Sequence, residues 1–160
     1  MIEKILTALF LACFLSSLGT PKLNAGDLHP SPLILRGHLF DNSFNVEFAI
    51  DAEKRRKGLM FRKQMDPDSA MLFLFEKNHQ PFMWMKNTYI SLDMLFINEA
   101  GNVVYIVENT MPLSETPIHP PADVEAYAVL EVKAGSVKRK GIQVGDHVIH
   151  PLLSPINHSR

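Results

Sequence analysis

Six side chains in the middle of the chain are of the types that bind a small polar ligand. Tryptophan offers a flat face on which a sugar ring or another planar polar molecule stacks, while cations and amides hold its hydroxyl or anionic groups. Trp84 would stack on the ligand, Asn87 and Asp93 would orient it, and the basic side chains would hold its polar groups. The candidate ligand-binding residues are Arg55, Arg62, Trp84, Lys86, Asn87 and Asp93.

The tryptophan and its neighbours also have a structural interpretation. In an extended segment over residues 82–86, Phe82, Trp84 and Lys86 share one face, because successive side chains of a strand alternate. Trp84 would then be a core aromatic ring against which the stem of Lys86 packs. The sequence leaves open whether this pair forms the floor of a ligand site or part of the core.

Asp93 opens a segment whose remaining residues, MLFI, are apolar on both faces. A carboxylate there should be at least half-buried and needs a cation or several N–H donors. We expect Asp93 to form a polar cluster with Lys86 and with Arg62 or Arg55. Such a cluster is either a buried ion pair that supports the fold or a functional carboxylate in a pocket.

Other catalytic chemistry finds little support in the sequence. Neither a Gly-x-Ser-x-Gly elbow nor a phosphate-binding loop is present. A hydrolase that uses Asp93 as its acid or base is an alternative, and Glu131 could supply a second carboxylate. We assign no catalytic residue, and the sequence favours a binding protein over an enzyme.

Metal binding is a further hypothesis that we weigh against ordinary packing. Six methionines fall between residues 60 and 94, and thioethers suit Cu(I), but methionine is also a common core residue. His147 and His150 lie on opposite faces if they belong to a strand, which separates them as zinc ligands. The sequence therefore predicts no metal site and no cofactor.

Several blocks of sequence occur in a distinctive order and spacing. They are residues 55–62 (RRKGLMFR), 71–73 (MLF), 84–88 (WMKNT), 92–93 (LD) with Phe96, 130–131 (LE), 134–135 (AG), 141–142 (GI) and 144–146 (VGD). In this arrangement the chain resembles the family called domain of unknown function 192, over about residues 35–148. Ala70 and Ser91 stand where the family usually has Gly and Pro. The resemblance implies a small, mostly β domain, often exported or membrane-tethered, and no known reaction.

The elements that position these residues are mostly short strands. Phe44, Val46, Phe48 and Ile50 alternate with polar residues, as in a strand with one buried face. Asp51 is a suitable N-cap for a helix from residue 52 to about Gly58. Further strands are expected at residues 33–40, 71–75, 82–86, 93–97, 103–107, 126–133 and 147–150, with a single helical turn at 135–141.

This pattern predicts the fold class. The chain should be mainly β with one or two short helices, folded as a compact single-domain sandwich or partly closed barrel. Residues 111–122 contain four prolines and should form an ordered loop or cover. The domain is expected over residues 33–150, after a short linker at 26–32 and before a flexible tail at 151–160.

The first 25 residues have the features of a signal peptide. A charge-free run over residues 5–18 follows Lys4 and is too short to span a bilayer, and Ala25 allows cleavage before Gly26. An uncleaved anchor and a lipoprotein acceptor at Cys13 are the alternatives. Cleavage would remove Cys13, the only cysteine, and would place the domain in the periplasm or outside the cell.

These features limit the expected partners. A net charge of −1 argues against a nucleic-acid-binding protein, which should have a basic face. We expect the domain to bind a small polar ligand, with carbohydrates among the candidates, or an envelope protein. Contact with the membrane would come only through an uncleaved N-terminal segment. A purely structural or interaction module is the third alternative.

Overall fold

The computed structural model describes residues 31–76 and 80–153. Within these ranges the chain is mainly β with two short helices, as the sequence predicts. The strands are β1 (Ser31–Arg36), β2 (Asp41–Ala49), β3 (Ser69–Leu74), β4 (Leu92–Ile97), β5 (Val103–Val107), β6 (Ala128–Lys133) and β7 (His147–Ile149). The helices are α1 (Ala52–Lys57) and α2 (Ser136–Lys140).

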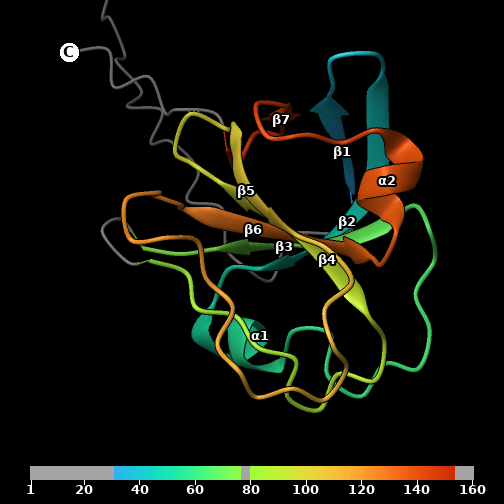
Figure 1. Ribbon diagram of the computed structural model, residues 1–160, viewed down its shortest axis with the longest axis vertical. Helices are drawn as coiled ribbons and strands as arrows, with labels where there is room; N and C mark the ends of the chain where they lie inside the picture. The colour runs from blue at the N-terminus through green and yellow to red at the C-terminus, as the bar shows by residue number, and fades with distance from the viewer. Residues whose placement is uncertain (1–30, 77–79, 154–160) are drawn as a thin grey trace, which may run out of the picture.

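The strands form one curved sheet in the order β5-β4-β6-β3-β2-β1-β7. Its two edges approach each other, since Asn102 and His147 form a bridge and the Val148 N–H donates to the Gly101 carbonyl at 2.8 Å. The sheet is therefore a nearly closed barrel (Figure 1). Of the two architectures that the sequence allows, the structure forms the barrel.

A single parallel pair among the described strands determines where α1 lies. β2 and β3 run parallel, with Asn45 opposite Ser69, so the chain must cross over between them, and α1 forms part of this crossover. The helix begins as predicted, with the Lys54 N–H donating to Asp51 Oδ1 at 2.7 Å. It ends at Gly58, whose φ of 44° favours glycine.

The sheet has a different hydrophobic cluster on each face. Leu72, Leu95 and Leu130 belong to the cluster inside the barrel. Their alternating neighbours point to the outer face, where a methionine cluster (Met65, Met71, Met83, Met85 and Met94) packs with Phe73 and Phe96. Figure 1 shows α1 and the long loops gathered on one side of the sheet. These segments cover the outer face and create the space for a site there.

The prediction of a strand over residues 82–86 is wrong. Only Met83 pairs, in an isolated bridge with Ile118 of the proline-rich segment 111–122. Pro81 and Pro117 lack the N–H donors that a longer ladder needs. The predicted alternation of faces is nevertheless correct, since Met83 and Met85 are buried while Phe82 and Trp84 are exposed.

Some sequence predictions concern residues outside the described ranges. These are the signal peptide at 1–25 with Cys13, residues 26–30 of the linker and residues 154–160 of the tail. Neither helix in the described ranges has the length and apolar character needed to cross a membrane.

Candidate functional site

A pocket with a volume of about 170 Å³ lies on the outer face of the sheet. Four parts of the chain line it: α1 with the turn after it, β3 with Phe75, the segment from Phe82 to Thr88, and β6. The lining residues are Arg55, Arg56, Lys57, Gly58, Leu59, Met60, Phe73, Phe75, Phe82, Met83, Trp84, Lys86, Thr88 and Glu131. Three of the six predicted residues, Arg55, Trp84 and Lys86, are therefore brought together.

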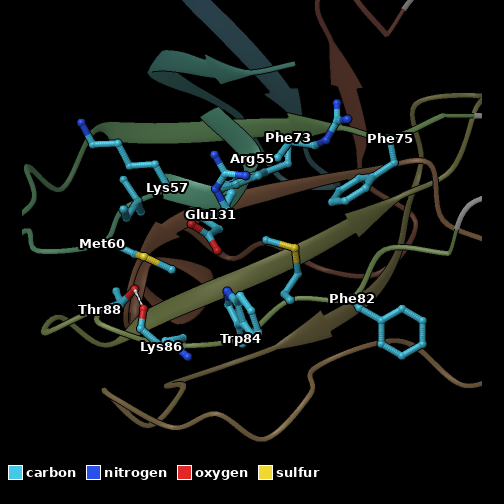
Figure 2. A pocket seen from close by; sticks show the side chains of 14 residues that line it. Arg55, Lys57, Met60, Phe73, Phe75, Phe82, Trp84, Lys86, Thr88 and Glu131 are labelled. Carbon is cyan, nitrogen blue, oxygen red and sulfur yellow. Dashed lines mark hydrogen bonds between the residues drawn. The ribbon is translucent and has the colours of Figure 1, made fainter. Parts of the chain in front are cut away.

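Glu131 forms the floor of this pocket. It lies on β6 directly opposite Met71 of β3 and Met94 of β4, so apolar thioether side chains flank it on both sides. Its side chain is only 4% exposed, and Figure 2 shows its carboxyl directed into the space between Met60 and Trp84. No group in residues 31–76 or 80–153 forms a hydrogen bond or ion pair with this carboxyl.

Burial determines the protonation of Glu131. Removal from water disfavours the charged form and raises the pKa of Glu131 to about 8, although the positive charge of Arg62 opposes the shift. At neutral pH the side chain is therefore mostly a neutral carboxylic acid. Such a group can both donate and accept a hydrogen bond at the bottom of the pocket.

Four basic side chains surround the pocket, and they differ in what they already contact. Arg55 is tied to the scaffold, since its Nη1 donates to the carbonyls of Ile50 at 2.7 Å and Leu74 at 3.0 Å. Arg56 and Lys57 are exposed and form no ion pair within the described part of the chain. These two cations are available to an incoming group.

Trp84 and Lys86 form a second wall, as the sequence predicts for neighbours on one face. The Lys86 ammonium lies 5.6 Å from the centre of the Trp84 ring and 3.4 Å from Glu115 Oε2. Trp84 remains 47% exposed, so much of its ring is open to solvent or to a ligand. Phe82, also exposed, lines the same pocket, and an exposed apolar patch of this kind suits a binding surface.

The predicted cluster of Asp93 with Lys86 and an arginine does not form. Asp93 is fully buried, and its two carboxylate oxygens accept hydrogen bonds from the backbone N–H groups of Asn109 at 2.9 Å and Val137 at 3.0 Å. Backbone donors thus replace the expected cation, and Asp93 caps the first turn of α2. Asp93 lines neither this pocket nor its neighbour.

Arg62 lies in a neighbouring pocket with a volume of about 260 Å³. Its guanidinium donates two hydrogen bonds of 2.6 Å to the carboxylate of Glu47. The hydrogen bonds lower the pKa of Glu47 and raise that of Arg62. Arg62 therefore does not line the first pocket, but its positive charge opposes the rise in the pKa of Glu131.

Asn87 lies beside the first pocket and does not line it. Its φ of 54° is a left-handed conformation that asparagine tolerates. The Asn87 carbonyl accepts from the Phe61 N–H at 2.8 Å, and its Nδ2 lies 4.0 Å from Met60 Sδ. Asn87 thus positions the turn that carries Met60 to the pocket.

A family model supports the resemblance that the sequence motifs suggest. The model of DUF192, described as "Uncharacterized ACR", matches residues 35–150. The chain belongs to the DUF192 family. No curated protein matches the chain.

Two solved structures resemble this DUF192 chain, both with a TM-score of 0.70. One is a protein of Sinorhizobium meliloti described as a candidate transcription regulator, 40% identical, covering 78% of this chain and 97% of that one. The other is a protein of unknown function from Novosphingobium aromaticivorans, 32% identical, covering 82% of this chain and 100% of that one.

One feature of the sequence indicates that Glu131 is unusual, although this residue is not among the six predicted ligand-binding residues. In the DUF192 domain Glu131 lies in β6, and every residue of this strand before Lys133 is buried. A charged residue inside an otherwise apolar strand is expensive, so it marks a position with a particular environment. Its neighbours in space, Met60 and Trp84, come from distant segments and could not be identified from β6 alone.

Metal-ligating groups are not clustered in the described part of this DUF192 domain. No group of three or more His, Cys, Asp or Glu side chains there could hold a metal ion. His147 contacts Asn102 Oδ1 at 3.0 Å, and His150 contacts the Ser31 hydroxyl at 3.2 Å. The two imidazoles therefore contact different parts of the barrel.

Proposed function

We propose that this DUF192 domain binds a small polar ligand in the pocket above Glu131. The observation that carries the proposal is the largely buried carboxyl of Glu131, which is directed into a pocket and is hydrogen-bonded by none of the described residues. A ligand that enters the pocket can accept a hydrogen bond from this carboxyl or donate one to it.

The pocket walls suit a molecule with both polar and apolar parts. Trp84 offers its exposed face, and Phe73 and Phe75 add aromatic surface deeper in the pocket. The charged groups stand at separate places around this surface, with Glu131 at the floor, Lys86 on one wall and the basic residues of α1 on the other (Figure 2). This combination of apolar walls and a few fixed polar groups is typical of ligand sites.

The alternatives predict different behaviour at this site. A hydrolase that relies on Asp93 is disfavoured, because both oxygens of Asp93 already accept backbone hydrogen bonds away from the pocket. A structural or interaction module would tolerate an empty pocket and would bind no ligand whose affinity depends on Trp84.

We also propose that the domain acts after export. An intact mass that lacks residues 1–25 would support this proposal.

A thermal-shift screen tests the binding proposal. The purified chain is heated alone and with neutral sugars, small organic acids, nucleotides and double-stranded DNA. A ligand at a hundredfold excess over its Kd stabilises the folded state by about 2.7 kcal/mol, which raises Tm by several degrees. We expect at least one small molecule to do so, and we expect Trp84→Ala to remove the shift.

The control variant is Phe40→Ala, which removes an exposed aromatic ring that does not line the pocket. It should retain the ligand-induced shift. If no small molecule stabilises the chain, or if Trp84→Ala responds like the wild type, the pocket is not the binding site and the proposal fails.

A further inference from the structure

We infer that the ligand is a small organic acid whose carboxylate is held by Arg56 and Lys57 and whose opposite, uncharged polar end reaches Glu131. This inference rests on the proposed function and names the ligand class for the same pocket. It is carried by the distribution of charge around the pocket and by the isolation of the buried carboxyl.

The charge around the pocket favours an anion. Four cations and a single acid line it within the described part of the chain. Arg55 is engaged with backbone carbonyls, and Lys86 has Glu115 as a counterion. Arg56 and Lys57 line the same pocket and have no counterion there, so an anionic group that enters it would meet two unpaired positive charges.

The floor of the pocket favours an uncharged polar group. No side chain or backbone group in the described ranges hydrogen-bonds Glu131, and its neighbours across the sheet are Met71 and Met94. Because burial keeps this acid protonated at neutral pH, it can donate to a hydroxyl or carbonyl oxygen of the ligand. A second anionic group at this depth would be held only while Glu131 keeps its proton.

The walls between these two ends favour a carbon skeleton. Met60, Phe73 and Trp84 line the pocket around Glu131, with Trp84 on the side opposite to α1 (Figure 2). An inorganic phosphate or sulfate has no apolar surface to place against them. With about 170 Å³ the pocket is smaller than the roughly 300 Å³ at which sites for drug-sized ligands begin, so the acid must be small.

Matched pairs of compounds test the charge requirement. Isothermal titration calorimetry compares a panel of small carboxylic acids with their neutral amides, including glucuronate with glucuronamide and 4-hydroxybenzoate with 4-hydroxybenzamide. We expect an acid to bind at least about tenfold more tightly than its amide, which corresponds to about 1.4 kcal/mol. The double variant R56A/K57A should lose this preference and bind acid and amide alike.

The matched control is K63A/K138A, which removes two exposed lysines that do not line the pocket. It should keep the preference, and both double variants should keep the wild-type Tm because all four side chains are exposed. The proton on Glu131 supplies a second readout. Wild-type affinity should fall above pH 8, whereas Glu131→Gln should bind with an affinity that does not change between pH 6 and pH 9.

The outcomes separate this inference from the proposed function. Binding of neutral compounds with no preference for acids would overturn the inference and leave the pocket as a ligand site. Acid binding that survives R56A/K57A would also overturn it. Absence of binding by every acid and every amide would overturn the inference, and the proposed function would fail only if the thermal-shift screen with sugars and nucleotides were also negative.

Discussion

Asp93 and Glu131 are buried acids on neighbouring strands that face opposite sides of the same sheet. Asp93 is paired with Val132, and Glu131 is paired with Met94, so the two carboxyls alternate across the β4–β6 ladder. On the barrel side Asp93 receives two backbone N–H groups, whereas Glu131 on the outer face receives no hydrogen bond from the described residues. This arrangement separates the two acids and does not allow them to act together on one substrate.

The capping role of Asp93 predicts a loss of stability in Asp93→Asn. The amide keeps one acceptor oxygen but turns an N–H₂ group toward the second backbone donor, at Asn109 or Val137. One buried N–H then lacks an acceptor, which should reduce the free energy of unfolding by about 1–3 kcal/mol. Urea unfolding measures the loss, and faster hydrogen exchange at the Val137 amide locates it.

Asp123→Asn, at an exposed position, is the control for this change and should be near neutral. Unchanged stability combined with lost ligand binding or lost turnover in Asp93→Asn would contradict the structural role. Such a result would show that Asp93 takes part in binding or catalysis.

The burial of Glu131 predicts a stability that falls as the pH rises. The unfolded side chain loses its proton near its ordinary pKa of 4.5, while the folded one keeps it until about 8. Between these values the folded state binds more protons, so the free energy of unfolding decreases with pH and levels off above 8. For this shift the loss reaches about 4 kcal/mol at pH 8.

Glu131→Gln removes the titrating group and should abolish most of this pH dependence. The variant should match the wild type near pH 4 and exceed its stability at pH 8. Urea unfolding at pH 4, 6 and 8 measures the difference, with the exposed Glu125→Gln as a control that should follow the wild type. Parallel pH profiles for wild type and Glu131→Gln would show that the carboxyl is not buried as described.

The contacts of Arg55 predict that it holds α1 against the sheet. Arg55→Met keeps an apolar stem but loses the hydrogen bonds to the carbonyls of Ile50 and Leu74. We expect destabilisation of about 1–3 kcal/mol, with increased hydrogen exchange in α1. Arg56→Met changes the adjacent, exposed arginine and should stay within about 0.5 kcal/mol of the wild type. Equal effects of the two substitutions would contradict the positioning role of Arg55.

Local sequence patterns predicted most of the elements correctly. The alternation from Phe44 to Ile50 gave a strand that the structure places at Asp41–Ala49, and the Asp51 cap and Gly58 terminus delimit α1. These features depend on residues a few positions apart. The strand expected at 82–86 does not form, because its partner segment, 111–122, is rich in proline. The pairing could not be predicted from local patterns, since this segment lies far away in the sequence.

The candidate site was predicted in part for the same reason. Trp84 and Lys86 are neighbours in an alternating segment, so their common face followed from the sequence. The partners of Asp93 could not be predicted, since Val137 belongs to α2 and lies 44 residues further along the sequence. The sequence suggests Glu131 only as a second carboxylate of a hydrolase. Its place in the pocket could not be predicted, because three other parts of the chain form the rest of that pocket.

The sequence by itself determined the β class, the faces of the strands, the ends of α1 and the motifs of the DUF192 family. Only the tertiary structure decided the parallel pairing of β2 with β3, the near closure of the barrel and the different surroundings of Asp93 and Glu131. The physical reason is that backbone preferences and side-chain alternation are local, whereas burial and hydrogen-bond partners depend on which distant segments meet. For an acid, these distant neighbours decide whether it is a capped carboxylate or a protonated group in a pocket.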